Sequence, residues 1–165
     1  MIFDYKTLTK PITKSELIMV NSYSHTSFTV SNIEKSIAFY VDQLGLTLTR
    51  RWERKGPEIQ ALTGVTDARL SMALVECGDF KLELIQYVDG AGEILNPVIN
   101  NVGAAHIAFQ VNDVDAFCKR LVENGVSLYG TPSTLPPPRV RGVYISDPDG
   151  ITIELSEPRN RLIDL

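Results

Sequence analysis

The chain has two histidines, His25 and His106, and both begin similar stretches of sequence. Each is followed by a phenylalanine three residues later, a valine five residues later and an asparagine or aspartate seven residues later. The two histidines therefore occupy equivalent positions in an internal repeat. Imidazole is a common metal ligand, so two histidines at matching positions indicate a shared metal site rather than two unrelated structural residues.

Two glutamates repeat in the same way, Glu83 between Leu82 and Leu84 and Glu154 between Ile153 and Leu155. A carboxylate in the middle of an apolar-flanked strand is costly to bury unless it is paired or binds a metal. Two imidazoles and two carboxylates suit Zn, Ni, Co, Mn or Fe and leave positions open for a substrate. If a pseudo-twofold relates the two halves, we expect all four side chains to meet in one cleft.

The elements that must position these side chains follow from the same repeat. Side chains alternate between the two faces of a strand, so each histidine is expected on the more polar face. A helix follows each histidine strand, with Asn32 and Asp113 as N-caps and Gly45 and Gly125 after the last turn. Further strands are predicted at residues 46–54, 68–77, 80–87, 126–129, 140–146 and 151–156, a short helical or irregular stretch at 58–63, and a loop at 131–138.

Each half thus has the order strand–helix–strand–strand–strand, which predicts an α+β fold of two tandem βαβββ modules. The predicted organisation is an N-terminal arm at 1–21, a first module at 22–88, a connector at 89–103, a second module at 104–157 and a C-terminal tail at 158–165.

The composition limits the partners and the compartment. Of the 165 residues 44% are hydrophobic and the formal net charge is −4, as in an ordinary globular protein. The sequence has no lysine- or arginine-rich run of the kind that binds nucleic acid. It also has no apolar run that reaches the ~18 residues of a membrane helix. Residues 1–20 lack the apolar core of a signal peptide, so we expect a cytoplasmic protein. Cys77 and Cys118 are expected to be buried free thiols.

Taken together, these residues resemble the vicinal oxygen chelate superfamily, which includes glyoxalase I, methylmalonyl-CoA epimerase, extradiol dioxygenases and bleomycin and fosfomycin resistance proteins. The resemblance covers about residues 22–157. It rests on His25, Ile37-Ala-Phe39-Tyr40, Leu44-Gly45-Leu46, Lys81-Leu-Glu83-Leu, Gly103-Ala-Ala-His106-Ile-Ala-Phe109, Asp147-Pro-Asp-Gly150 and Ile153-Glu154-Leu155.

The resemblance implies that the two modules form a cupped, mostly antiparallel eight-stranded sheet around one divalent metal ion, commonly within a homodimer. It places His25, Glu83, His106 and Glu154 on the four metal-ligand positions. Methylmalonyl-CoA epimerases usually carry glutamine where this chain has Glu83. The glutathione-contacting basic and asparagine pattern of glyoxalase I is also not seen.

Three functions fit these features. The first is a metal-dependent isomerase or lyase of the glyoxalase or epimerase type, which transfers a proton next to a carbonyl, with Glu154 as the principal base and Glu83 as its partner. The second is an extradiol-type dioxygenase, although its site needs only one carboxylate and Glu83 would crowd it. The third is a binding protein that sequesters a drug or metabolite.

A small-molecule substrate is expected in each case. Strand alternation suggests Arg51, Gln110 and Tyr144 as residues that line the cup, and Arg139 follows the Pro-rich loop where it could meet an anionic substrate.

Overall fold

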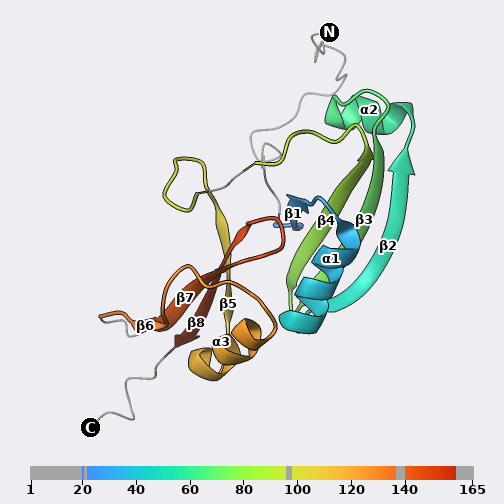
Figure 1. The fold of residues 1–165 in the computed structure, drawn as a ribbon. Helices are drawn as coiled ribbons and strands as arrows, with labels where there is room; N and C mark the ends of the chain where they lie inside the picture. The colour runs from blue at the N-terminus through green and yellow to red at the C-terminus, as the bar shows by residue number, and fades with distance from the viewer. Residues whose placement is uncertain (1–19, 21, 96–97, 137–139, 159–165) are drawn as a thin grey trace, which may run out of the picture.

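The computed structural model describes residue 20 and residues 22–95, 98–136 and 140–158. Two modules with similar element order follow one another along the chain (Figure 1). The first contains β1 (Thr26–Thr29), α1 (Ile33–Ala38), η2 (Phe39–Gln43), β2 (Thr47–Lys55), α2 (Pro57–Thr63), β3 (Arg69–Cys77) and β4 (Phe80–Asp89). The second contains β5 (His106–Gln110), α3 (Val114–Glu123), β6 (Ser133–Thr134), β7 (Val140–Ser146) and β8 (Thr152–Pro158).

Each module builds one four-stranded sheet, with the orders β1-β4-β3-β2 and β5-β8-β7-β6. The first and last strand of each module pair in parallel, and the other neighbours are antiparallel. The predicted α+β class with two modules and a mostly antiparallel pairing is confirmed. The eight strands form two separate curved sheets, which are not hydrogen-bonded into one.

The helices begin where the repeat predicts. The Asn32 side chain accepts a hydrogen bond from the Lys35 amide, and the Asp113 side chain accepts one from the Ala116 amide, so both residues are N-caps. The first helix continues from α1 into a π-helical segment, η2. Gly45 and Gly125 follow the two helices with φ of 81° and 82°, a conformation that favours glycine.

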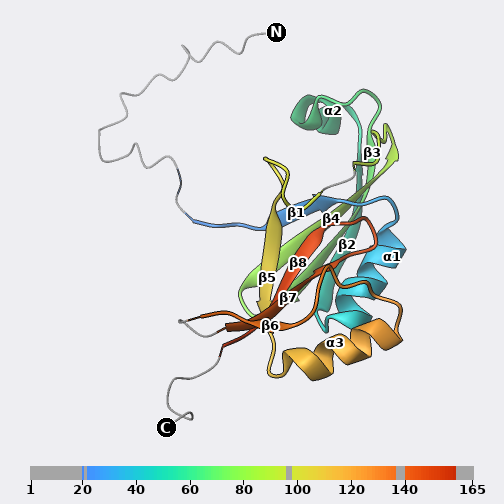
Figure 2. The same cartoon turned by 60° about the vertical axis from the view of Figure 1, so that its left-hand side comes forward.

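The two modules share one hydrophobic core. It contains Leu82 and Leu84 of β4 together with Ile153 and Leu155 of β8, and it also includes Tyr40, Val114 and Leu121 from the helical segments. Figure 2 shows α1 and α3 close to each other on the same side of the molecule, where Arg120 donates a hydrogen bond of 2.6 Å to the Gln43 carbonyl. The modules therefore pack through the faces that their helices cover.

Three sequence expectations fail. Residues 126–129 form only an isolated bridge, Leu128 to Ile145, and β6 lies instead within the predicted loop. Cys77 is exposed because it ends β3, whereas Cys118 is buried as predicted.

The N-terminal arm lies almost wholly outside the described residues. No helix in the described part of the chain is long and apolar enough to cross a membrane.

Candidate metal centre

The first module brings His25 and Glu83 together. His25 immediately precedes β1, and the parallel register pairs Ser27 with Glu83, which places His25 and Glu83 on the same face. The His25 Nε2 lies 3.6 Å from the Glu83 Oε2. The other ring nitrogen, Nδ1, lies 3.0 Å from the Ser24 Oγ, and the Ser27 hydroxyl donates to the Glu83 Oε2 at 3.3 Å. Both side chains are thus oriented by neighbouring serines.

The second module repeats this arrangement with different neighbours. The His106 Nε2 lies 3.3 Å from the Glu154 Oε2, and the Tyr144 ring packs edge-on against the imidazole at 5.3 Å. Tyr144 and Glu154 are register partners in β7 and β8, so their side chains lie side by side on one face. Burial first, and the Glu154 charge second, raise the pKa of Tyr144, so the phenol stays a hydrogen-bond donor at neutral pH.

The two nitrogen–oxygen separations fit a pair of metal ligands. Ligand atoms that each lie about 2.1 Å from one ion are about 3.0 Å apart at an angle of about 90° and about 3.6 Å apart at about 120°. The observed 3.6 Å and 3.3 Å fall within this interval and exceed the usual length of an N–H···O hydrogen bond. Imidazole and carboxylate are also ligands that Zn, Mn, Fe, Co and Ni accept.

The expectation that all four side chains meet in one cleft of a single chain is wrong. Among the residues that the structure describes, no group of three or more His, Cys, Asp or Glu side chains could hold one ion. The reason lies in the packing of the modules. Leu82, Leu84, Ile153 and Leu155 join the shared core, so Glu83 and Glu154, which alternate with them, lie on the opposite faces of their sheets. In one chain the four candidate ligands therefore form two separate His–Glu pairs, which we call half-sites.

The other predicted substrate residues differ in where they lie. Tyr144 and Gln110 are on the face of Glu154. Tyr144 is the register partner of Glu154, and Gln110 lies two residues after Ala108, the other register partner of Glu154. Gln110 also lines a cavity beside the start of α3. Arg139 lies outside the described residues.

The structure corrects the predicted position of Arg51, which does not line the cup. A β-bulge between Leu48 and Arg50 breaks the regular alternation of β2, so Arg51 pairs with the core residue Ala73 and points to the helix-covered face. There its guanidinium forms an ion pair with Glu34 of α1.

The bulge places residues on the face of Glu83 that sequence reasoning missed. Arg50 is the register partner of Leu74, and Leu74 is the partner of Glu83 in the next strand. Trp52 follows on the same face, and its ring lies 4.9 Å from the Arg50 guanidinium carbon. Strand alternation alone could not have found them because it has no signal for one inserted residue.

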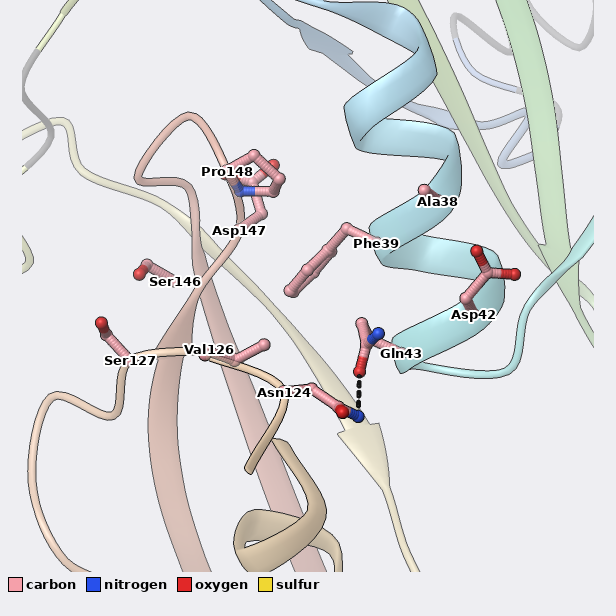
Figure 3. Close-up of a pocket in the computed structure, with 11 residues that line it drawn as sticks. Ala38, Phe39, Asp42, Gln43, Asn124, Val126, Ser127, Ser146, Asp147 and Pro148 are labelled. Atoms are coloured by element: carbon pink, nitrogen blue, oxygen red, sulfur yellow. Dashed lines mark hydrogen bonds between the residues drawn. The ribbon is translucent and has the colours of Figure 1, made fainter. Parts of the chain in front are cut away.

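A separate cavity of about 330 Å³ lies between the modules (Figure 3). Phe39 and Gln43 line it from the first module, and Asn124, Val126 and Asp147 line it from the second. The Asn124 amide donates to the Gln43 Oε1 at 2.9 Å across this boundary. None of the four candidate ligands lines the cavity, so it belongs to the contact between modules and not to the half-sites.

Comparisons with known proteins agree with this architecture. The chain is 30% identical over 139 residues to glutathione transferase FosA of Serratia marcescens, covering 83% of this chain and 81% of that protein. It is 29% identical over 137 residues to lactoylglutathione lyase of Salmonella typhimurium, covering 82% and 92%. The crystal structure of a glyoxalase family protein from Bacillus cereus has the same fold, with a TM-score of 0.77, 23% identity and coverage of 86% and 96%.

Residues 22–155 match the family described as the Glyoxalase/Bleomycin resistance protein/Dioxygenase superfamily, which is most of the chain. The protein therefore belongs to this superfamily.

Proposed function

We propose that the protein is a divalent-metal-dependent enzyme that transfers a proton next to a carbonyl group of a small, metal-chelated substrate. The observation that carries this proposal is the pair of equivalent His–Glu contacts, with nitrogen–oxygen separations of 3.6 Å and 3.3 Å that suit two ligands of one ion. Two carboxylates among four ligands favour proton transfer, since one can hold the ion while the other accepts a proton.

A complete centre needs two copies of the chain. Each chain offers one half-site from each module, and the two lie on sheet faces turned away from the shared core. In a dimer with twofold symmetry, the contact that brings the first half-site of one copy to the second half-site of its partner occurs twice. Two centres then form, each with His25 and Glu83 from one subunit and His106 and Glu154 from the other.

Glu154 is the proposed base. It removes the proton from the hydroxyl-bearing carbon next to the carbonyl, and the electron pair of that C–H bond moves towards the carbonyl oxygen. The same carboxylate then returns the proton to the former carbonyl carbon, while the hydroxyl proton moves to the former carbonyl oxygen, so that the hydroxyl-bearing carbon becomes the new carbonyl. A divalent ion, when bound, stabilises the negative charge that develops on the substrate oxygen. The Tyr144 phenol lies beside Glu154 on the same sheet face, where it can donate a hydrogen bond that orients the carboxylate. Glu83, oriented by Ser27, keeps the ion in place.

The names of two relatives suggest substrates. The lactoylglutathione lyase is named for a thioester whose formation from a 2-oxoaldehyde and glutathione requires this kind of proton transfer. The match to glutathione transferase FosA favours a second candidate, transfer of glutathione to a small chelated substrate. Assays with glutathione and either methylglyoxal or fosfomycin separate the two.

The test combines metal analysis with substitution of the base. We expect the purified protein to bind one divalent ion per chain and to convert the adduct of methylglyoxal and glutathione to the thioester. Glu154→Gln should lower turnover by about 10²- to 10⁴-fold with the metal retained. Glu123→Gln, an exposed change on α3, is the matched control and should leave turnover unchanged. Full turnover in Glu154→Gln, or in protein stripped of metal, would contradict the proposal.

A further inference from the structure

We propose that Arg50, held over the Trp52 ring, binds an anionic oxygen group of the substrate, a carboxylate or a phosphate. This inference rests on the proposed function, because it concerns the far end of a substrate whose near end chelates the ion. Three observations support it: the position of Arg50, the lack of a carboxylate partner for this arginine among the described residues, and the apolar side chains beside it on the same face.

The position follows from the strand register. Glu83 in β4, Leu74 in β3 and Arg50 in β2 are successive partners across the sheet, so all three side chains project from the same face. Two inter-strand spacings separate the backbones of Glu83 and Arg50 by about 10 Å. An arginine side chain can span much of this distance, which leaves room for a small molecule between the guanidinium and the half-site.

Three other arginines are paired with carboxylates, whereas Arg50 and Arg54 form no ion pair among the residues that the structure describes. Arg51 pairs with Glu34, Arg69 with Asp89 and Arg141 with Asp115. Within the part of the chain that the structure describes, no ion pair or hydrogen bond holds the Arg50 side chain, and its guanidinium carbon lies 4.9 Å from the centre of the Trp52 ring. Stacking on an aromatic ring limits the orientations of the guanidinium while its N–H donors stay available, an arrangement suited to two-point binding of a carboxylate or phosphate.

The surface beside this arginine is apolar. Leu70 and Met72 of β3 lie on the face of Glu83 with Trp52 and Ile85 packed against them, and Ile59 of α2 covers the far end of this cluster. Leu70 and Met72 are themselves buried, so a hydrocarbon or aromatic group of a substrate would bury apolar area on the partly exposed Trp52 and Ile85. The geometry thus favours a substrate with two chelating oxygens at one end, an apolar body and an anionic group at the other end.

The experiment uses the fact that Trp52 is the only tryptophan in the chain. Metal-loaded protein is titrated with benzohydroxamate and with its para-carboxy and para-phosphono derivatives, which share two chelating oxygens and differ in the distal group. Intrinsic fluorescence then reports binding from a single known position. Arg50→Gln is the test variant. Arg51→Gln is the matched control, since that guanidinium lies on the opposite face and its exposed ion pair contributes little to stability.

We expect at least one anionic derivative to bind about 10- to 100-fold more tightly than the neutral hydroxamate. Arg50→Gln should abolish this preference without changing the affinity for the neutral compound, and Arg51→Gln should preserve it. The derivative that binds more tightly identifies the anionic group. Equal affinity for all three compounds, or a preference that persists in Arg50→Gln, would overturn the inference. Metal-independent binding of every hydroxamate would instead contradict the proposed function.

Discussion

His25 and His106 hold equivalent positions in the two modules, but the side chains that surround them differ. The His25 ring contacts Ser24 through Nδ1, whereas the His106 ring packs against Tyr144. Glu83 accepts a hydrogen bond from a serine, and Glu154 lies beside a phenol. The repeat therefore supplies two similar pairs of ligands, and the surrounding residues can give the two glutamates different roles.

The Ser24 contact leads to a prediction at the scale of single residues. A hydrogen bond to one imidazole nitrogen fixes the ring so that the other nitrogen faces the metal. Ser24→Ala should therefore weaken metal binding by about tenfold, measured by competition with a chelating dye. Ser71→Ala is the control, because its partner Gln86 lies on the helix-covered face. Unchanged affinity in Ser24→Ala would show that Ser24 does not orient the ring.

The sequence predicted which histidine lies beside which glutamate better than it predicted the side chains around them. The repeat alone singled out His25, Glu83, His106 and Glu154, and the structure pairs them as two His–Glu contacts. Arg51 was misplaced because one inserted residue in β2 reverses which side chain faces the half-site. Such an insertion has no local signature, since the residues around it are all compatible with a strand.

At the scale of elements, the helices were the most predictable part of the fold. The two helices of the repeat, α1 and α3, are each preceded by a residue whose side chain accepts a hydrogen bond from a backbone amide of the first turn, at 3.0 Å for Asn32 and 2.9 Å for Asp113. Asn32→Ala and Asp113→Ala should each lower the free energy of unfolding by about 0.5–2 kcal/mol in urea denaturation. The losses should add in the double variant, because the two caps share no partner.

Asp113→Asn provides the control for the caps, since asparagine retains the accepting oxygen and should preserve stability. Two alanine variants as stable as the unchanged protein would contradict the capping assignment.

The strands of the second module were less predictable. Residues 126–129 alternate like a strand but contribute one bridge, and the short β6 lies in a segment rich in proline and threonine. The two residues of β6 count as a strand because they pair with Gly142 and Arg141 of β7. Their own side chains do not determine this pairing. Sequence patterns cannot report a pairing of this kind.

At the scale of the whole molecule, a buried hydrogen bond links the modules. The Tyr40 hydroxyl of η2 donates to the Asp147 Oδ2 at 3.0 Å, and the amides of Asp149 and Ile151 donate to the other oxygen. Burial raises the pKa of Asp147 above its ordinary value and outweighs these hydrogen bonds. The contact between modules therefore includes a carboxylate whose charge is costly to bury.

This raised pKa has a defined effect on stability. Above about pH 4, the ordinary pKa of an aspartate, the unfolded chain releases a proton that the folded protein still holds, so this group loses stabilising effect as the pH rises. The free energy of unfolding of the unchanged protein, relative to Asp147→Asn, should fall as the pH increases from about 4 towards the raised pKa. Denaturation across this range measures it, and a constant or rising difference would contradict the assignment.

Packing between the modules was the feature that the sequence could not predict. The repeat is compatible with two modules that join around a common metal site and with two modules that join through their helix-covered faces. The structure has the packing through the helix-covered faces, because one core buries the large apolar residues Leu82, Leu84, Ile153 and Leu155. Burial of that core leaves the half-sites apart and is the reason for proposing a dimer.

The central claim, one metal centre built from two subunits, is tested most directly by mixing two inactive variants. One chain carries His25→Ala and Glu83→Ala, the other carries His106→Ala and Glu154→Ala, and different affinity tags allow the heterodimer to be isolated. Each homodimer should bind no metal. The heterodimer should contain one intact centre of the two, with about half of the metal and turnover of the unchanged dimer. A folded heterodimer without bound metal would contradict the account.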